Sequence, residues 1–272
     1  MLSLRFVFNL ILFLLLSSNI QAHSEQKIKD FYISNFKEDG SRDWEVEGIE
    51  AIIYDKHVDI DKMKAHYYLK DDTILITSDK ARLDKGNMDV YLKDNVYIEN
   101  KDGANVMTDS LNWQRQKNHI DTKDWVKVRK DSMQVEAKGL SADTQLRKAD
   151  FTEDVEVTFP DEKTKQVTTV TCTGPLEIEY GLGKAVFNKN VVATHPQGKM
   201  FSDKATLYFD PAEKVIIKIV SEGNVKIIRD ENTTFSQKAT YLNKEQKVIL
   251  EGRPRLIYYQ QDDGKSEKDL FD

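Results

Sequence analysis

The side chains that most often do chemistry are scattered along this chain of 272 residues. The five histidines form neither a His-x-His nor a Glu-x-x-His pair, the spacings that bring two metal ligands together. They are His23, His57, His66, His119 and His195. We therefore predict no metal site and no cofactor.

Other reactive groups also have simple structural interpretations. The single cysteine, Cys172, shares the parity of Val170 in an apolar run, which favours a buried structural thiol over a nucleophile. Gly181-Leu182-Gly183 lacks the rest of a dinucleotide-binding loop and is typical of a hairpin turn. Acidic pairs such as Asp71-Asp72 fall in predicted turns, where solvated carboxylates are the simpler explanation. We expect a protein that is not an enzyme.

The N-terminus is the strongly apolar part of the chain. Arg5 is followed by an apolar run from Phe6 to Leu16 and then by small and polar residues up to Ala22. This is the layout of a signal peptide over residues 1–22, and an uncleaved anchor over residues 2–20 is the alternative. Either segment carries the body of the chain out of the cytoplasm. The formal net charge of −6 argues against binding to nucleic acid.

An internal repeat organises the rest of the sequence. Three near-copies read ITSDKARL from Ile76, MFSDKATL from Met200 and TFSQKATY from Thr234. Weaker copies fill the gaps and give seven units of about thirty residues. The second half of each unit alternates apolar and polar residues, as in Val90 and Leu92. Period-two alternation predicts strands with one buried face.

The first half of each unit changes phase. Ile76 and Ser78 share one parity, whereas Ala81 and Leu83 share the other. A slip of one residue would turn all later side chains outward unless the strand bends, so we predict a corner or β-bulge at Asp79-Lys80 and at its equivalents.

Turn-forming residues lie between the apolar pairs. They are Asp84-Lys85-Gly86-Asn87, Asp94-Asn95, Asp210-Pro211, Glu222-Gly223-Asn224 and Asn243-Lys244. The sequence therefore predicts a meander of about fifteen short antiparallel strands. Strands with one apolar face must stack or curl, which favours an all-β fold, an elongated, twisted antiparallel β-jelly roll that forms an open trough. A parallel β-helix is the second choice, since its rungs are usually shorter and richer in glycine and asparagine.

The longest spacing between units contains the charged segment from Phe159 to Gln166. We place a domain boundary there, with one module at residues 27–160 and a second at residues 166–260. The last residues, 261–272, are charged and predict a loose tail.

These modules resemble a known family. The opening from Phe31 to Tyr54, which contains the segment WEVEGIEA, and the units at 74–98 and 104–128 resemble LptC, a periplasmic component of lipopolysaccharide transport. The units at 198–227 and 233–258 resemble the LptA (OstA) family, which relays lipopolysaccharide across the periplasm. The type LptC has one such module and keeps its anchor, so a fusion of both roles and an elongated member of either family stay open.

The resemblance implies a non-catalytic periplasmic carrier that holds the acyl chains of lipopolysaccharide in an apolar groove. Its implied partners are the inner-membrane ABC transporter complex, other OstA-fold bridge proteins end to end, and the outer-membrane translocon. A homo-oligomer is also open. Nucleotide hydrolysis must belong to a partner because this chain has no Gly-x-x-x-x-Gly-Lys loop. Unpaired strand edges at the two ends of a trough suit docking by strand addition. The candidate edge residues are Phe31, Tyr32, Ile33, Leu256, Ile257 and Tyr258.

The candidate groove residues share the inward parity. They are Ile76, Leu83, Val96, Ile98, Val106, Leu111, Trp113, Val126, Val128, Leu140, Val155, Val157, Leu176, Phe187, Val191, Leu207, Val225, Ile227 and Tyr241. A closed sandwich would show the same alternation, so each single position is also explained as ordinary core, and the lipid hypothesis depends on the set.

Two other classes of function remain as alternatives. A secreted β-repeat binding or structural protein, such as an adhesin or a carbohydrate-binding jelly roll, would display aromatic side chains on an exposed face. We expect most aromatics here to point inward or to lie beside turns. A β-helical polysaccharide enzyme would need carboxylates aligned on successive units, but the equivalent positions vary between Asp, Lys, Gln and Thr.

Overall fold

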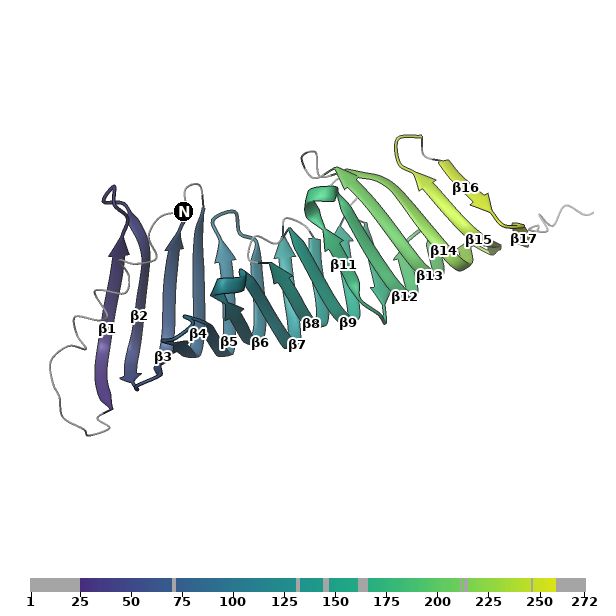
Figure 1. The fold of residues 1–272 in the computed structure, drawn as a ribbon. Helices are drawn as coiled ribbons and strands as arrows, with labels where there is room; N and C mark the ends of the chain where they lie inside the picture. Colours follow the sequence, from purple (N-terminus) through teal and green to yellow (C-terminus); the bar gives the residue numbers. More distant parts are fainter. Residues whose placement is uncertain are drawn as a thin grey trace, which may run out of the picture.

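The computed structural model describes residues 25–257 except 70–71, 131–132, 144–146, 161–165, 211, 213–214 and 246. The predicted signal or anchor segment and the predicted tail lie outside these residues. In this part of the chain the fold is all-β (Figure 1).

The described residues form seventeen strands and two short 3-10 turns. The strands are β1 (Gln26–Phe36), β2 (Arg42–Ile53), β3 (His57–Tyr68), β4 (Thr73–Asp84), β5 (Val90–Asn100), β6 (Asn105–Gln114), β7 (His119–Lys130), β8 (Met133–Asp143), β9 (Lys148–Pro160), β10 (Val167–Cys172), β11 (Leu176–Glu179), β12 (Lys184–His195), β13 (Gly198–Asp210), β14 (Val215–Arg229), β15 (Asn232–Leu242), β16 (Lys247–Glu251) and β17 (Arg255–Ile257). The 3-10 turns are η1 (Arg115–Lys117) and η2 (Tyr180–Leu182).

The strands form one antiparallel meander in which each strand pairs with its neighbours in sequence. β10 and β11 share one level of the sheet between β9 and β12. β16 and β17 likewise share the level next to β15. The described strands therefore make fifteen levels, or rungs, which confirms the predicted antiparallel jelly-roll trough of about fifteen strands.

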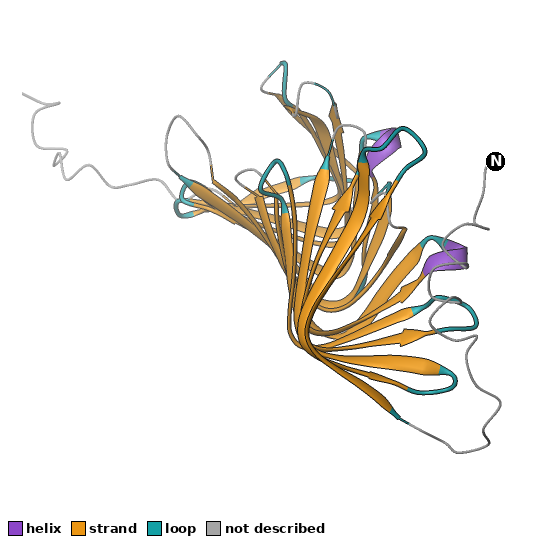
Figure 2. Cartoon of the chain, turned by 90° about the vertical axis from the view of Figure 1, so that its left-hand side faces the viewer, coloured by secondary structure: helices purple, strands orange, loops and turns teal. Residues whose placement is uncertain are grey.

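The long strands bend near their middle, and the bends align across the sheet, whereas β10, β11, β16 and β17 each lie on one arm. The pairing register shifts between Thr77 and Lys80 in β4, and between Phe201 and Lys204 in β13. Ser78, before the bend, and Ala81, after it, are both buried. The predicted corner is confirmed. In Figure 2 the strands fold along one common line into two arms. We call the arm that contains residues 73–78 the first arm and the arm that contains residues 80–84 the second arm.

Two of the predicted turns are wrong. Asp94 and Asn95 lie inside β5, and Gly223 and Asn224 lie inside β14. All four have positive φ angles, between 49° and 77°. Asn, Asp and Gly tolerate this left-handed conformation in hairpin turns and in bulges alike, so residue type alone does not distinguish the two. These residues form the corner, and the strands are longer than predicted because both arms belong to one strand.

Polar side chains brace the outside of the corner. Lys62 Nζ contacts Asp79 Oδ1 at 2.7 Å, and Asn95 Nδ2 donates to Asp79 Oδ2 at 2.8 Å. The hydrogen bond from Lys62, followed by that from Asn95, lowers the pKa of Asp79. The same arrangement recurs where Asn224 Nδ2 donates to Asp203 Oδ2 at 2.9 Å. These contacts tie neighbouring strands together where the ladder is interrupted.

The sheet is continuous across the predicted domain boundary. β9 ends at Pro160, β10 begins at Val167, and these two residues pair directly. One buried cluster is centred on β3 to β6, and a larger one extends from β6 to β13. The division into modules at residues 27–160 and 166–260 stays a prediction.

Candidate functional site

The inner face of the trough consists of rows of side chains that run across the strands. The first end row lies on the first arm and runs by direct pairing from Ile33 in β1 through Ile98 to Leu256 in β17. The second end row lies on the second arm and runs from Ile53 in β2 to Val248 in β16. Between each end row and the bend lies a corner row. The inner face is thus apolar along almost its whole length.

All nineteen candidate groove residues point to this inner face. The corner rows contain Val96, Leu111, Val126, Leu140, Val155, Leu176, Phe187, Val191 and Val225, all of them buried. The end rows contain Ile76, Leu83, Ile98, Val106, Trp113, Val128, Val157, Leu207, Ile227 and Tyr241. Of these, Ile76, Val106 and Val157 are buried and the others are half-buried. The end rows are therefore the more accessible part of the trough.

The centre of the trough is filled by its own side chains. Leu140, Phe151, Leu176 and Phe187 occupy adjacent positions of the second corner row and are 1–3% exposed. Even in the first end row, Val157 is only 1% exposed in this region. A guest in this region would have to displace protein side chains.

The two ends of the trough are open by comparison. Ile33, at the start of the first end row, is 45% exposed, and Leu256, at its other end, is 64% exposed. Val248, at the end of the second end row, is 52% exposed. The apolar interior therefore reaches solvent at both ends.

Sequence reasoning missed a regular alternation of size in the first corner row. Val96, Val126 and Val155 alternate with smaller side chains, Thr108 and Ala137, on the strands between them. The row continues with Cys172, Val191, Ser202, Val225 and Ser236. The inward parity of the serines was visible in the repeats, but a search restricted to large apolar residues leaves them out.

The buried thiol of Cys172 confirms its predicted place in the core. The side chain is 3% exposed, and Sγ donates to the carbonyl oxygen of Gly174 at 3.3 Å. Burial raises the pKa of this thiol, which disfavours the nucleophilic thiolate. Among the described residues, no cluster of His, Cys, Asp and Glu has the arrangement of a metal site.

The outer face carries more aromatic side chains than expected. Trp125 in β7 is 56% exposed, and Tyr97, Phe201 and Phe235 also lie on the outer face. Lys226 Nζ lies 5.9 Å from the ring centre of Phe201 and 6.0 Å from that of Phe235. These four residues depart from the expectation that most aromatics point inward or lie beside turns. At Phe201 and Phe235 the outward rings pack against the stem of Lys226.

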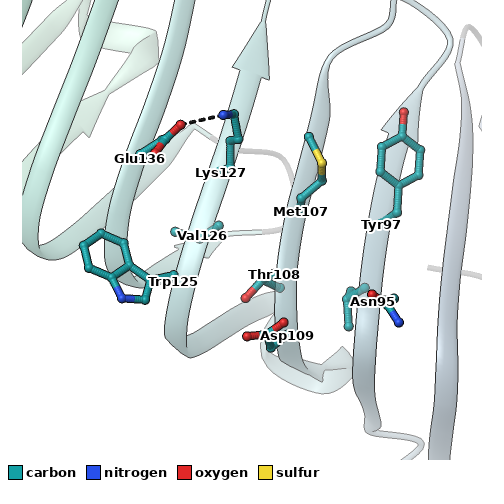
Figure 3. Close-up of a pocket in the computed structure, with 10 residues that line it drawn as sticks. Asn95, Tyr97, Met107, Thr108, Asp109, Trp125, Val126, Lys127 and Glu136 are labelled. Carbon is teal, nitrogen blue, oxygen red and sulfur yellow. Dashed lines mark hydrogen bonds and ion pairs between the residues drawn. The ribbon is translucent and has the colours of Figure 1, made fainter.

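A shallow pocket of about 410 Å³ lies on the outside of the corner, between β5 and β8. Figure 3 shows Tyr97, Met107 and Trp125 around it, with the ion pair of Lys127 and Glu136 at one side. The pocket opens on the outer face, and its lining also includes Val96, Thr108 and Val126 of the first corner row.

The predicted docking residues lie on the outermost strands. Phe31, Tyr32 and Ile33 belong to β1, which among the described strands pairs with β2 alone. Leu256 and Ile257 belong to β17, which pairs with β15 alone. Tyr258 lies outside the described residues. The free backbone groups of β1 and β17 are in position for strand addition.

A polar cluster attaches the edge strand β1 to its neighbours. Tyr32 and Tyr68 donate hydrogen bonds to the carboxylate of Glu45 at 2.7 and 2.8 Å. Arg42 and His66 contact the same carboxylate at 3.0 and 3.1 Å. The hydrogen bond from Tyr32, followed by that from Tyr68, lowers the pKa of Glu45. The cluster contains acid, base and hydroxyl groups, but each is engaged in holding β1, β2 and β3 together.

A single bent antiparallel sheet with an apolar inner face and two free edges defines the class of open β-jelly-roll trough proteins. The model of one family, described as lipopolysaccharide-assembly, LptC-related, matches residues 14–160, more than half of the chain. The chain belongs to the LptC family. The match ends at β9, so β10 to β17 lie beyond it, and the resemblance of that part to LptA stays a prediction. No curated protein matches the sequence.

Family membership places the chain in lipopolysaccharide transport in the periplasm. A search of the described residues for a helix long and apolar enough to cross a membrane finds none.

Proposed function

We propose that this protein is a non-catalytic carrier that receives lipopolysaccharide from the inner-membrane ABC transporter complex and passes it toward the outer membrane. The observation that carries the proposal is the row of inward apolar side chains that extends from Ile33 to Leu256 and is exposed at both ends. The acyl chains would lie against the end rows, and the sugars would stay in water.

The hydrophobic effect supplies enough free energy for this task. Burial of one methylene group is worth about 0.8 kcal/mol, so an acyl chain of roughly twelve carbons gains about 10 kcal/mol. That gain holds the lipid without covalent chemistry. This free energy does not favour movement of the lipid in either direction along the trough. Net transport must therefore be driven by nucleotide hydrolysis in a partner.

Photocrosslinking in cells tests the carrier function. Photoreactive residues at Val128 and Ile227 replace half-buried side chains of the first end row, where a bulky group is tolerated better than at its buried positions. We expect both to form adducts with lipopolysaccharide. Lys127 and Lys226 are matched controls, because each precedes its partner on the same strand and points to the outer face. Adducts confined to Lys127 and Lys226 would contradict the proposal.

We further propose that β1 and β17 are the docking edges for neighbouring trough proteins. Residues 25–53 carry eight acidic and four basic side chains, whereas residues 232–272 carry seven of each. The net negative charge of the β1 end favours a partner that offers a basic edge, and two β1 ends repel each other.

Crosslinkers at Tyr32 and Leu256, which are 55% and 64% exposed, test these edges. We expect Tyr32 to capture the partner on the transporter side and Leu256 to capture the partner on the outer-membrane side. Capture of a second copy of this chain would identify a homo-oligomer. If neither position captures any trough protein, the docking assignment is wrong.

A further inference from the structure

The pocket on the outside of the corner contains an exposed tryptophan. Trp125 in β7 is 56% exposed, although a side chain of this size usually buries most of its surface. Met107 in β6 and Tyr97 in β5 line the same pocket in Figure 3, and both are half-buried. Three neighbouring rungs thus place an apolar, partly aromatic surface on the outer face. Neither the trough nor a free sheet edge explains it.

Polar groups surround this apolar surface. Asp109 in β6 is exposed, and neither its carboxylate nor the indole N–H of Trp125 has a hydrogen-bond or ion-pair partner among the described residues. Lys127 in β7 and Glu136 in β8 form an ion pair at one side of the pocket. The pocket therefore offers a free acceptor, a free donor and a charged pair around an apolar centre.

The position of the pocket excludes recognition by strand addition. β6 pairs with β5 and β7, and β7 pairs with β6 and β8, so these strands have no free edge. A ligand here must be recognised by side chains alone. The two carboxylates of Asp109 and Glu136, against the one ammonium group of Lys127, also disfavour an anionic ligand.

The spacing of the two aromatic rings favours an extended ligand. An aromatic cage for an organic cation needs rings that surround one point. Tyr97 and Trp125 instead lie on strands two rungs apart, a separation of about 10 Å, with Met107 on the strand between them. This arrangement suits two successive rings of one chain better than a single small cation.

We propose that this pocket binds two successive rings of a neutral, extended sugar chain, one ring on Trp125 and the next toward Tyr97. A sugar ring with equatorial hydroxyls has apolar C–H faces and a polar rim, so it can lie on an aromatic ring while its hydroxyls bond to polar side chains. Asp109 would accept a hydrogen bond from one hydroxyl, and the pair of Lys127 and Glu136 would bind another.

This inference goes beyond the carrier function. The pocket opens on the convex side of the bend, whereas acyl chains in the trough would lie on the concave side. The sugar chain therefore belongs to a molecule other than the lipid in the trough. A protein with both sites would be held at a polysaccharide by its outer face while its inner face stays available.

Binding of soluble sugars to the purified protein tests the site. The probes are cellotetraose and N-acetylated chitotetraose, which are extended β-linked chains, and maltotetraose, whose α-linkages bend the chain. We expect at least one β-linked probe to bind with a Kd on the order of 1 mM and about 3-fold or more tighter than maltotetraose, as measured by saturation-transfer NMR. The proposal fails if neither β-linked probe shows saturable binding, or if tetramethylammonium binds more tightly than both.

Substitutions locate the binding. Trp125→Ala should weaken it about 10-fold or more, and Trp125→Phe should keep most of it. Asp109→Ala should weaken it about 3- to 10-fold, the loss expected for one hydrogen bond. Tyr91→Ala is the matched control, because Tyr91 lies on the outer face of β5 and is 40% exposed but does not line the pocket. Unchanged affinity in Trp125→Ala would refute the site.

Two further measurements separate the sugar chain from the transported lipid. Lipopolysaccharide adducts at Val128 and Ile227 should persist in Trp125→Ala, since the pocket does not hold the acyl chains. The saccharide of lipopolysaccharide, freed of its acyl chains, should bind more weakly than the better β-linked probe. If it binds more tightly than all the neutral probes, the pocket belongs to the transported lipid and the inference of a separate sugar chain is wrong.

Discussion

The centre of the trough and its two ends are built from the same repeat, but they differ in how much of the apolar face is covered. In the centre, Phe151 and Phe187 fill the second corner row and are each 3% exposed. At the ends, Ile33 is 45% exposed and Val248 is 52% exposed. The centre therefore stabilises the sheet, whereas the ends keep apolar surface available. One fold supplies both properties because strands flank the centre on both sides and the edge strands on one side only.

Truncation of the central core gives the largest expected effect. Phe151→Ala should lower the free energy of unfolding by about 3–5 kcal/mol, since it leaves a cavity in a filled region. Leu207→Ala, at a half-buried position of the second end row, should cost about 1–2 kcal/mol. Denaturant unfolding of both variants measures the difference. Equal losses would show that the two regions are packed alike.

Glycine substitutions compare the central corner with an open hairpin. Gly139 and Gly103 have nearly the same φ, 80° and 81°, so alanine strains the backbone equally at both positions by about 1–2 kcal/mol. A Cβ at Gly139 would also lie 2.7 Å from Thr152 Oγ1, whereas one at Gly103 meets nothing within 4 Å. Thermal unfolding should therefore show a larger loss for Gly139→Ala. A similar loss of thermal stability in both variants would mean that the side chain of Thr152 shifts to accommodate the added Cβ.

Enlarged side chains sharpen the comparison from the opposite direction. Ala142→Leu places extra volume in the filled centre, where Ala142 is 3% exposed, and should cost about 1–3 kcal/mol. Val248→Phe, at the C-terminal end of the second end row, should cost less than about 1 kcal/mol, because Val248 is 52% exposed. Equal losses from the two variants would mean that this end is packed like the centre.

Low pH should destabilise a third region, the N-terminal strands. Of the changes considered, this one should have the smallest effect on stability. The pKa values of Glu45, Asp59 and Asp79 are lowered by hydrogen bonds from Tyr32, Arg82 and Lys62 respectively. A lowered pKa means that these groups stabilise the fold above the ordinary carboxyl pKa, and that this contribution is lost as the pH falls below about 4. The melting temperature should therefore fall most steeply below about pH 4, and its drop between pH 6 and pH 2.5 should be smaller in Asp79→Asn. An identical drop in that variant would exclude the contribution of Asp79.

Alternation in the sequence predicted the fold but not the filling of the trough. The phase slip between Ser78 and Ala81 predicted the bend, because a strand cannot keep both residues inside without one. Parity also placed every groove candidate on the inner face. It could not separate Val157, which is sealed, from Ile227, which is half-buried, since both have the same period. That difference arises from contacts between residues far apart in the chain.

Turns and aromatics were the less predictable features. Asp94-Asn95 has the composition of a hairpin turn but forms a corner, because the left-handed conformation serves both. Trp125 points outward because its place in the strand overrides its hydrophobicity.

The length of the trough depends on the number of rungs in the meander. Neighbouring strands lie about 4.8 Å apart, so fifteen rungs extend over roughly 65–70 Å, and each added hairpin would lengthen the path by about 10 Å. Because each rung pairs only with the rungs beside it, a hairpin can be gained or lost without rearranging the others. A chain of this kind can be fitted to the distance it must cross by duplication of one repeat, and a longer chain would replace one protein-to-protein junction with continuous sheet.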